Sequence, residues 1–309
     1  MQIYLPIAEI PINMFMIFGM GGAVGFLSGL FGIGGGFLLT PLLIFTGIPP
    51  AVSVATVTTQ IVASSSSGVL VYWRQNAIDF KLAFVLLCSG IIGSVLGVWL
   101  FGVLKQLGQL DLVISLSYVT FLGTIGSLML VESVRAVTRR NSGQVQGRRR
   151  PGHHNWIHGL PFKMRFRRSK LYVSVIPIFV IGGSIGFLGS VLGIGGGFMM
   201  VPALIYLLRV PTSVVIGTSL LQILVTMSAA TILHSISTQT VDIVLALTLM
   251  VGGVIGAQFG AQVGQGMRGE HLRLLLAVLV LSVGVRFAYN IIVEPADPYS
   301  VVVSEVDNS

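Results

Sequence analysis

Apolar residues of this chain gather into eight long stretches, separated by short polar segments. They span approximately 14–46, 52–73, 80–103, 111–131, 172–208, 212–235, 241–264 and 272–292. Because a helix rises about 1.5 Å per residue, each stretch can cross a hydrocarbon core of about 30 Å. The first and fifth are too long for one crossing. The pattern predicts an all-α integral membrane protein with about eight to ten membrane segments.

The two overlong stretches carry nearly the same sequence. GFLSGLFGIGGGFLLTP at 25–41 and GFLGSVLGIGGGFMMVP at 186–202 are identical at ten of seventeen positions. The glycines of interest are Gly32, Gly34, Gly35 and Gly36 in the first copy and Gly193, Gly195, Gly196 and Gly197 in the second. Glycine weakens a helix and permits backbone conformations closed to other residues. We therefore expect each stretch to form two helical arms that are separated at the glycines. A pair of broken helices in corresponding positions of two halves is the strongest sequence indication of a transporter's binding site.

The repeat extends beyond the glycines, with an offset of 161 to 163 residues. Thr56 and Gln60 correspond to Thr218 and Gln222. A set of small residues corresponds as well: Gly90, Gly93 and Gly97 to Gly253, Gly256 and Gly260. We divide the chain into a first membrane repeat at 1–131, a basic loop at 132–171, a second membrane repeat at 172–293 and an acidic tail at 294–309.

Composition and charge agree with a membrane protein. The chain is 54% hydrophobic and 9% charged, whereas a soluble domain has about 25% charged residues. The net charge of +8 does not indicate nucleic acid, because eleven of the eighteen Lys and Arg fall between Arg135 and Lys170, in the loop that joins the repeats. The positive-inside bias places that loop in the cytoplasm.

The same bias favours halves of opposite orientation. If 14–46 and 172–208 each return to the side from which they entered, the two halves form inverted-topology repeats, and both termini face outward. Sixteen of the eighteen Lys and Arg then lie on the cytoplasmic side. The less favoured alternative has four full crossings in each half and parallel repeats.

The broken helices offer a site for an anion. A helix that begins after the glycines directs the positive end of its dipole into the gap. Thr56, Gln60, Thr218 and Gln222 add neutral donors nearby. For these four, ligand contact and helix packing are equally supported, whereas packing is favoured for the six glycines Gly90, Gly93, Gly97, Gly253, Gly256 and Gly260.

Other chemistry is sparse in the sequence. Cys88 is the single cysteine, and we predict no metal, cofactor or catalytic site. Asp79 and Asp242 fall at the ends of predicted spans, where we expect solvent. For His234, packing is favoured over proton coupling. Arg286 either extends toward the outer interface or faces a cavity.

The doubled pattern GxGGGxxxxP, at Gly32–Pro41 and Gly193–Pro202, resembles the sulfite exporter TauE/SafE family of membrane permeases. The resemblance implies a multi-pass protein of the bacterial inner membrane that moves sulfite, sulfoacetate or a related organosulfonate. The main hypothesis is a secondary transporter, an exporter, of a small sulfur-containing anion. An anion channel, a carrier for a small carboxylate, and a membrane enzyme or scaffold are the alternatives. The oligomeric state stays open.

Overall fold

The computed structural model describes residues 2–31, 35–141, 163–166, 171–206, 212–266 and 269–292. Two series of five α-helices follow each other along this part of the chain. The first comprises α1 (Met14–Phe31), α2 (Gly36–Phe45), α3 (Pro50–Arg74), α4 (Phe80–Gln106) and α5 (Leu110–Asn141). The second comprises α7 (Val175–Leu192), α8 (Gly197–Tyr206), α9 (Thr212–Leu233), α10 (Ile243–Gly266) and α11 (Gly269–Ile292). Both overlong stretches are thus divided at their glycines, as predicted.

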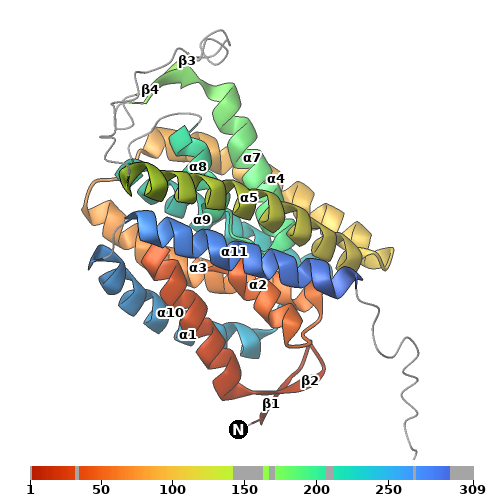
Figure 1. Cartoon of the computed structure of the whole chain (residues 1–309). Helices are drawn as coiled ribbons and strands as arrows, with labels where there is room; N and C mark the ends of the chain where they lie inside the picture. Colours follow the sequence, from red (N-terminus) through yellow and green to blue (C-terminus); the bar gives the residue numbers. More distant parts are fainter. Residues whose placement is uncertain are drawn as a thin grey trace, which may run out of the picture.

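A short antiparallel hairpin precedes each series of helices. The first pairs β1 (Gln2–Leu5) with β2 (Ile10–Asn13), and the second pairs β3 (Lys163–Phe166) with β4 (Leu171–Ser174). The hairpins lie at opposite ends of the molecule (Figure 1). Their registers, Gln2 opposite Asn13 and Lys163 opposite Ser174, differ by the repeat offset of 161 residues. Neither hairpin was predicted from the sequence, because strands of four residues are too short for a period of two to stand out.

Helices from opposite halves pack in pairs, α1 along α10 and α4 along α7, and their contacts show that the helices of each pair run in the same direction. Their backbones touch at glycines. A Cβ atom on Gly25 would collide with the backbone of Gly253, and one on Gly186 would collide with the backbone of Gly90. Such close approach is what small residues permit in membrane helices. The packing role expected for the glycines of α4 and α10 is confirmed.

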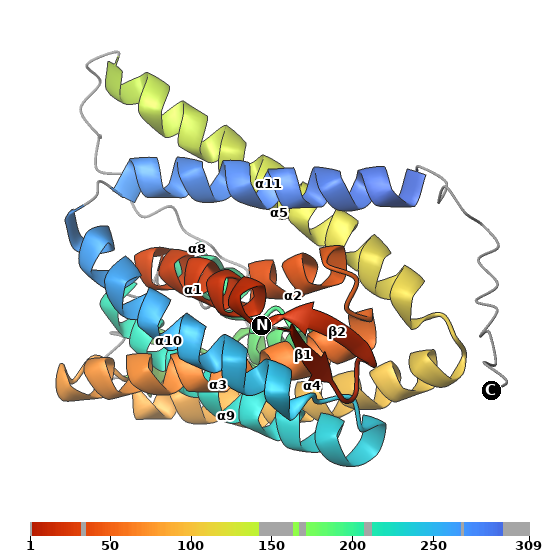
Figure 2. The same ribbon diagram turned by 90° about the horizontal axis from the view of Figure 1, so that it is seen from below.

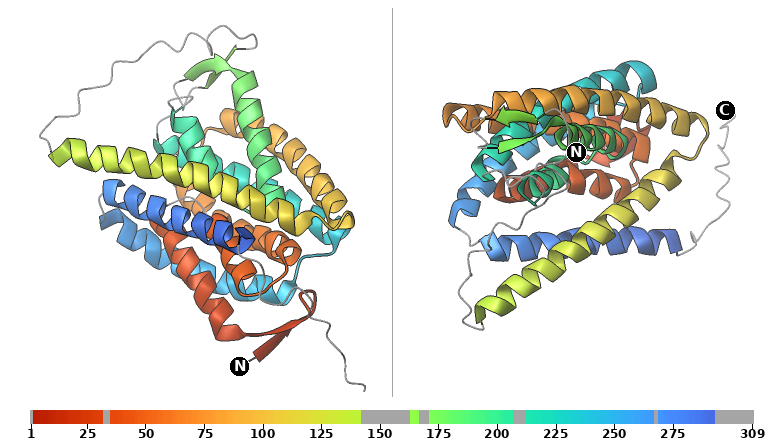
Figure 3. Two further views of the ribbon diagram at one scale, coloured as in Figure 1. Left: turned by 45° about the vertical axis from the view of Figure 1, so that its right-hand side comes forward. Right: turned by 90° about the horizontal axis from the view of Figure 1, so that it is seen from above.

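Two further pairs join corresponding helices, and both pairs are antiparallel. In the pair of α3 and α9, the hydroxyl oxygens of Thr58 and Thr231 are 2.8 Å apart, while Gly68 abuts Leu220. In the pair of α5 and α11, Gly126 packs against Leu281, and Gly284 packs against Leu122 and Gly123. Figures 2 and 3 show α5 and α11 together on one side of the bundle, with α3, α4 and α9 on the other. The larger cluster of buried side chains draws on both sides, for example Val57 of α3 and Tyr118 of α5.

The outer surface suits a lipid environment. Large apolar side chains such as Phe84, Trp99 and Phe259 are more than half exposed along the lengths of α4 and α10. Six helices in the described part of the chain are long and apolar enough to cross a membrane, and α1, α2 and part of α11 are shorter apolar helices. The fold is therefore that of an all-α membrane protein.

Candidate functional site

The two glycine segments meet in the interior of the protein. Thr40, on α2, donates its hydroxyl hydrogen to the carbonyl oxygen of Gly193 at 3.3 Å. A Cβ atom on Gly36 would lie 2.7 Å from the same oxygen. Residues 153 positions apart in the sequence are thus in direct contact. Gly32 and Gly34 lie outside the described residues.

The second glycine segment has a backbone that favours glycine. Gly193, Gly195 and Gly196 have φ angles of +67°, +76° and +74°, in the left-handed region that other residues rarely adopt. A Cβ atom on Gly196 would also collide with the side chain of Ile185. In the first segment Gly35 has an ordinary φ of −77°, so there the need for glycine comes from the space around it.

The helices that follow the glycines begin at this meeting point. In α2 the N–H groups of Leu38 and Leu39 donate to the carbonyl oxygen of Gly35, both at 3.2 Å. In α8 the N–H groups of Met199 and Met200 donate to the carbonyl oxygen of Gly196. Gly36 and Gly197 are the first helical residues and both are buried. The positive ends of two short helices therefore lie inside the protein, as the sequence predicted.

An apolar side chain fills the space between the glycine segments. Ile61, on α3, is fully buried, and its Cγ1 would lie 2.9 Å from a Cβ atom on Gly36. Its Cδ1 would lie 2.9 Å from a Cβ atom on Gly195. No signal in the sequence singled out Ile61, since it is one apolar residue among many. The Ile61 side chain therefore occupies the space between the two glycine segments.

The two threonines of the predicted site have a structural role. The backbone N–H of Asp242 donates to Thr56 Oγ1 at 3.1 Å, and the backbone N–H of Asp79 donates to Thr218 Oγ1 at 3.2 Å. The two bonds are related by the repeat and each joins one half of the protein to the other. The hydroxyls thus hold the start of α10 and the start of α4.

Asp79 and Asp242 are buried, with exposed fractions of 4% and 0%, so the expectation of solvent exposure was wrong. Each caps a helix instead. Asp79 Oδ1 accepts hydrogen bonds from the N–H groups of Lys81 and Leu82, and Asp242 Oδ1 accepts one from Leu245. Carboxylates in this position satisfy the first N–H groups of a helix and interact favourably with its dipole. The burial of these carboxylates could not be predicted from the sequence, because the exposure of a capping side chain depends on its tertiary neighbours.

The two glutamines differ from the threonines, because both keep polar atoms without a partner. Gln60 and Gln222 are each 1% exposed. Neither Nε2 nor Oε1 of Gln60 has a hydrogen-bond partner within the described residues, and Oε1 of Gln222 has none. Nε2 of Gln222 donates to Thr226 Oγ1 at 3.2 Å. Buried amides are normally satisfied, so an orphaned amide calls for an explanation.

Each glutamine lies against a glycine of the opposite half. A Cβ atom on Gly253 would lie 2.6 Å from Gln60 Nε2, and one on Gly90 would lie 2.6 Å from Gln222 Nε2. These two glycines therefore leave room for the amides as well as for helix packing. The hydroxyl oxygens of Thr59, Ser65 and Ser219 are also buried, and have no hydrogen-bond partner in the part of the chain that the structure describes.

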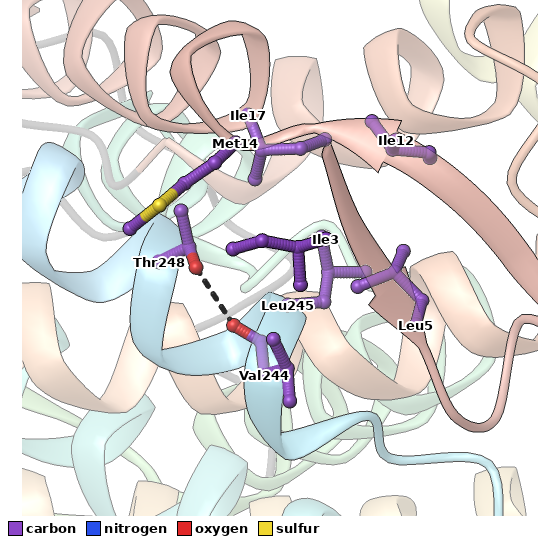
Figure 4. A pocket seen from close by; sticks show the side chains of 8 residues that line it. All are labelled: Ile3, Leu5, Ile12, Met14, Ile17, Val244, Leu245 and Thr248. Carbon is purple, nitrogen blue, oxygen red and sulfur yellow. Dashed lines mark hydrogen bonds between the residues drawn. The ribbon is translucent and has the colours of Figure 1, made fainter. Parts of the chain in front are cut away.

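A small pocket elsewhere has different chemistry. It lies where the first hairpin meets α10, lined mainly by apolar side chains such as Ile3, Leu5, Met14 and Leu245 (Figure 4). The hydroxyl of Thr248 at its wall donates to the carbonyl oxygen of Val244, so it offers no free donor to an anion. Among the residues that the structure describes, no three His, Cys, Asp or Glu side chains come together to hold a metal ion.

The fold and this interior site define a class of protein: a multi-pass helical membrane protein with two glycine-broken helices that meet inside it. The sequence profile described as sulfite exporter TauE/SafE matches residues 17–287. The chain belongs to this family, and is a membrane transporter.

Relatives cover nearly the whole chain. It is 25% identical over 284 residues to "Probable membrane transporter protein YunE" of Bacillus subtilis (strain 168), which covers 87% of this chain and 95% of the relative. It is 29% identical over 270 residues to "Probable membrane transporter protein YjnA" of the same organism, covering 86% and 96%. A shorter match, 32% identical over 108 residues, is to "Sulfite exporter TauE/SafE family protein 5" of Arabidopsis thaliana, covering 35% of this chain and 23% of the relative. No solved structure matches.

Proposed function

We propose that this protein is a secondary transporter, an exporter, of a small sulfur-containing anion such as sulfite, sulfoacetate or a related organosulfonate, in the inner membrane of a bacterium. The family supports membrane transport, and its description supports the sulfur-containing class. The observation that carries the proposal is the pair of buried, incompletely bonded amides, Gln60 and Gln222, at repeat-related positions. A ligand with several acceptor oxygens would satisfy their N–H groups.

The proposed site consists of the glycine segments, Gln60 and Gln222, with Thr56 and Thr218 holding its walls. No Lys or Arg occurs in the glycine segments. Neutral donors and helix dipoles bind an anion less tightly than an arginine clamp does, and an empty site then buries no uncompensated charge. Such a site suits a carrier that must release its cargo. The buried Ile61 between the glycines favours a carrier with a closed state over an open channel.

We also propose that the halves are inverted-topology repeats, with both termini outward and residues 132–171 in the cytoplasm. The antiparallel pairs α3–α9 and α5–α11 and the hairpins at opposite ends support the inversion. Asp242 supports the returning course of the first broken helix. Its carboxylate accepts a hydrogen bond from the N–H of Ile7, which precedes α1, and its own N–H donates to Thr56 on α3, which follows α2. Labelling of single cysteines with an impermeant reagent tests the topology, and a tail and a central loop found on one side would refute it.

A flux screen tests the function. Purified protein in liposomes is offered labelled sulfite, thiosulfate, sulfoacetate, sulfate and lactate, with empty liposomes as the control. We expect saturable exchange of a sulfur-containing anion. A preference for lactate would indicate a carboxylate carrier instead. Flux that neither saturates nor exchanges would identify a channel.

A further inference from the structure

A buried histidine stands at an unusual turn of the backbone. α9 continues into a π-helix, η1 (His234–Thr238), and such turns are rare and often mark functional sites. His234 has an exposed fraction of 0%, and its ring packs edge-on against Phe101 of α4 with ring centres 4.7 Å apart. The corresponding residue of the first repeat is Tyr72, so this histidine belongs to one half alone.

Both ring nitrogens face oxygen atoms. Nε2 lies 3.0 Å from the carbonyl oxygen of Ser190 on α7. A carbonyl oxygen only accepts, so Nε2 carries a hydrogen. Nδ1 lies 3.4 Å from the hydroxyl oxygen of Thr238. That oxygen is 2.8 Å from the carbonyl oxygen of His234 and 2.7 Å from the hydroxyl oxygen of Thr240.

This arrangement accommodates two protonation states of the ring. When Nδ1 is bare, the hydroxyl of Thr238 can donate to it. When Nδ1 carries a proton, the same hydroxyl can turn toward the carbonyl oxygen of His234 and accept from Nδ1. In both states Thr240 can donate to Thr238. Rotation of one hydroxyl therefore gives Nδ1 a hydrogen-bond partner in either protonation state, which avoids stranding a buried polar atom.

His234 also lies between the exposed Lys105 and the second glycine segment, which begins at Gly193. Its partner Ser190 is three residues before Gly193, where α7 ends. The hydroxyl of Ser190 donates to Ser94 on α4. In the other direction, the ammonium group of Lys105 donates to the carbonyl oxygen of Thr238 at 2.8 Å, and Lys105 is exposed. A change of charge at His234 thus acts directly on the helix that carries the second glycine segment.

Among the described residues, few other charged groups surround the ring. α7 has no titratable side chain along Val175–Leu192, and α9 has none along Thr212–Leu233. On α4, Lys105 is the charged residue that contacts η1. Asp242, which follows η1, engages its carboxylate oxygens with the N–H groups of Ile7 and Leu245.

We propose that His234 is the proton-coupling site of this transporter, binding and releasing one proton at Nδ1 in each transport cycle. The proposal rests on the proposed function. The ligand is the proton itself, and the anion that it accompanies is bound at the separate site of Gln60 and Gln222.

The experiment compares two fluxes of [35S]sulfoacetate in liposomes that contain the full chain. One is exchange at equal pH on both sides, and the other is net accumulation driven by a pH gradient of one unit. His234→Gln retains an amide donor for Ser190 and cannot titrate. We expect it to keep exchange within about twofold and its accumulation ratio to fall to about one, from the limit of about ten that one proton and one pH unit allow.

Thr238→Val provides a second arm if His234→Gln does not fold. It keeps the imidazole and removes the hydroxyl at Nδ1, whose hydrogen bond to the charged ring is about twice as strong as its bond to the neutral ring. We therefore expect the pH midpoint of exchange to fall by about one unit, the difference between the two bonds. Thr124→Val, on the exposed face of α5, is the matched control and should leave the midpoint unchanged.

The outcomes separate the two proposals. If the wild-type protein exchanges none of the five screened anions, the proposed transport function fails. If it exchanges sulfoacetate but a pH gradient drives no accumulation, or if His234→Gln accumulates it as the wild type does, the proton proposal is wrong. An unchanged midpoint in Thr238→Val would also overturn it.

Discussion

Replacing Gln60 by methionine should stabilise the protein and impair transport. Methionine has the length and unbranched shape of glutamine but lacks the amide. Both polar atoms of the Gln60 amide are buried without a partner in the described structure. An unpaired buried polar group costs about 1–3 kcal/mol in protein mutational data. Gln60→Met should therefore raise the free energy of unfolding by about that amount, or the melting temperature by roughly 2–6 °C.

The loss of function has its own magnitude. A neutral donor bonded to a charged ligand contributes about 1.5–3 kcal/mol, so loss of the Gln60 amide should lower kcat/KM for the anion by about 10- to 100-fold. Gln222→Met should show the same loss with less gain in stability, because Gln222 Nε2 already has Thr226 as a partner. Gln106→Met, at an exposed position near the end of α4, is the matched control.

Thermal unfolding in detergent and flux in liposomes are measured on the same preparations. A stability gain with a loss of flux is the signature of a polar group kept for a ligand. The reasoning is refuted if Gln60→Met melts at a lower temperature than the wild type and transports at the wild-type rate, since the amide would then be a structural group.

Three other substitutions test the surroundings of the site. Gly196→Ala should lower the free energy of unfolding by about 1–3 kcal/mol, because Gly196 has a φ of +74° and a Cβ atom there would collide with Ile185. An unchanged melting temperature would show that residue 196 does not need a left-handed conformation. Thr56→Val should cost about 1–3 kcal/mol by leaving the buried N–H of Asp242 without its acceptor, and Thr56→Ser should restore stability in the same melting assay. Arg286→Gln should leave flux within about twofold of the wild type, because Arg286 is exposed over the Phe45 ring and its cation–π contact contributes about 0.5–1 kcal/mol. If Arg286→Gln abolished flux, the binding site would lie toward α11.

The helix breaks and the glycine stripes could be predicted because their causes are local. A run of glycines in an apolar stretch weakens any helix that contains it. Small residues that recur at helical spacing indicate a close helix contact wherever the partner lies. Gly193 and Gly253 were therefore assigned to a break and to packing before any partner was known.

The roles of the polar residues depended on distant partners. Thr56 and Gln60 looked equivalent in the sequence, four residues apart and both repeated. The structure distinguishes them because Thr56 accepts a hydrogen bond from Asp242, which is 186 positions away, whereas the Gln60 amide has no hydrogen-bond partner in the described residues. Only a tertiary contact decides between packing and ligand binding at such positions. The position of Ile61 between the glycine segments was hidden for the same reason.

The unequal bonding of the two glutamines bears on how the site would open. In the second half Gln222 donates to Thr226, four residues later on the same helix. The corresponding residue in the first half is Ser64, whose hydroxyl donates to the carbonyl oxygen of Ile61 at 3.1 Å. If inverted repeats alternate by exchanging the conformations of their halves, Gln60 will bond to Ser64 in the opposite state and Gln222 will lose Thr226.

This exchange makes the two hydroxyls unequal in a measurable way. Thr226→Ala should lower the stability of the present conformation by about 1 kcal/mol, because it strands the Nε2 of Gln222. Ser64→Ala should leave the melting temperature nearly unchanged and slow turnover, because its bond to Gln60 forms only in the opposite state. Melting curves and turnover in liposomes measure both effects. Normal turnover in Ser64→Ala would mean that Gln60 finds no partner there, and that the conformations of the two halves are not exchanged during transport.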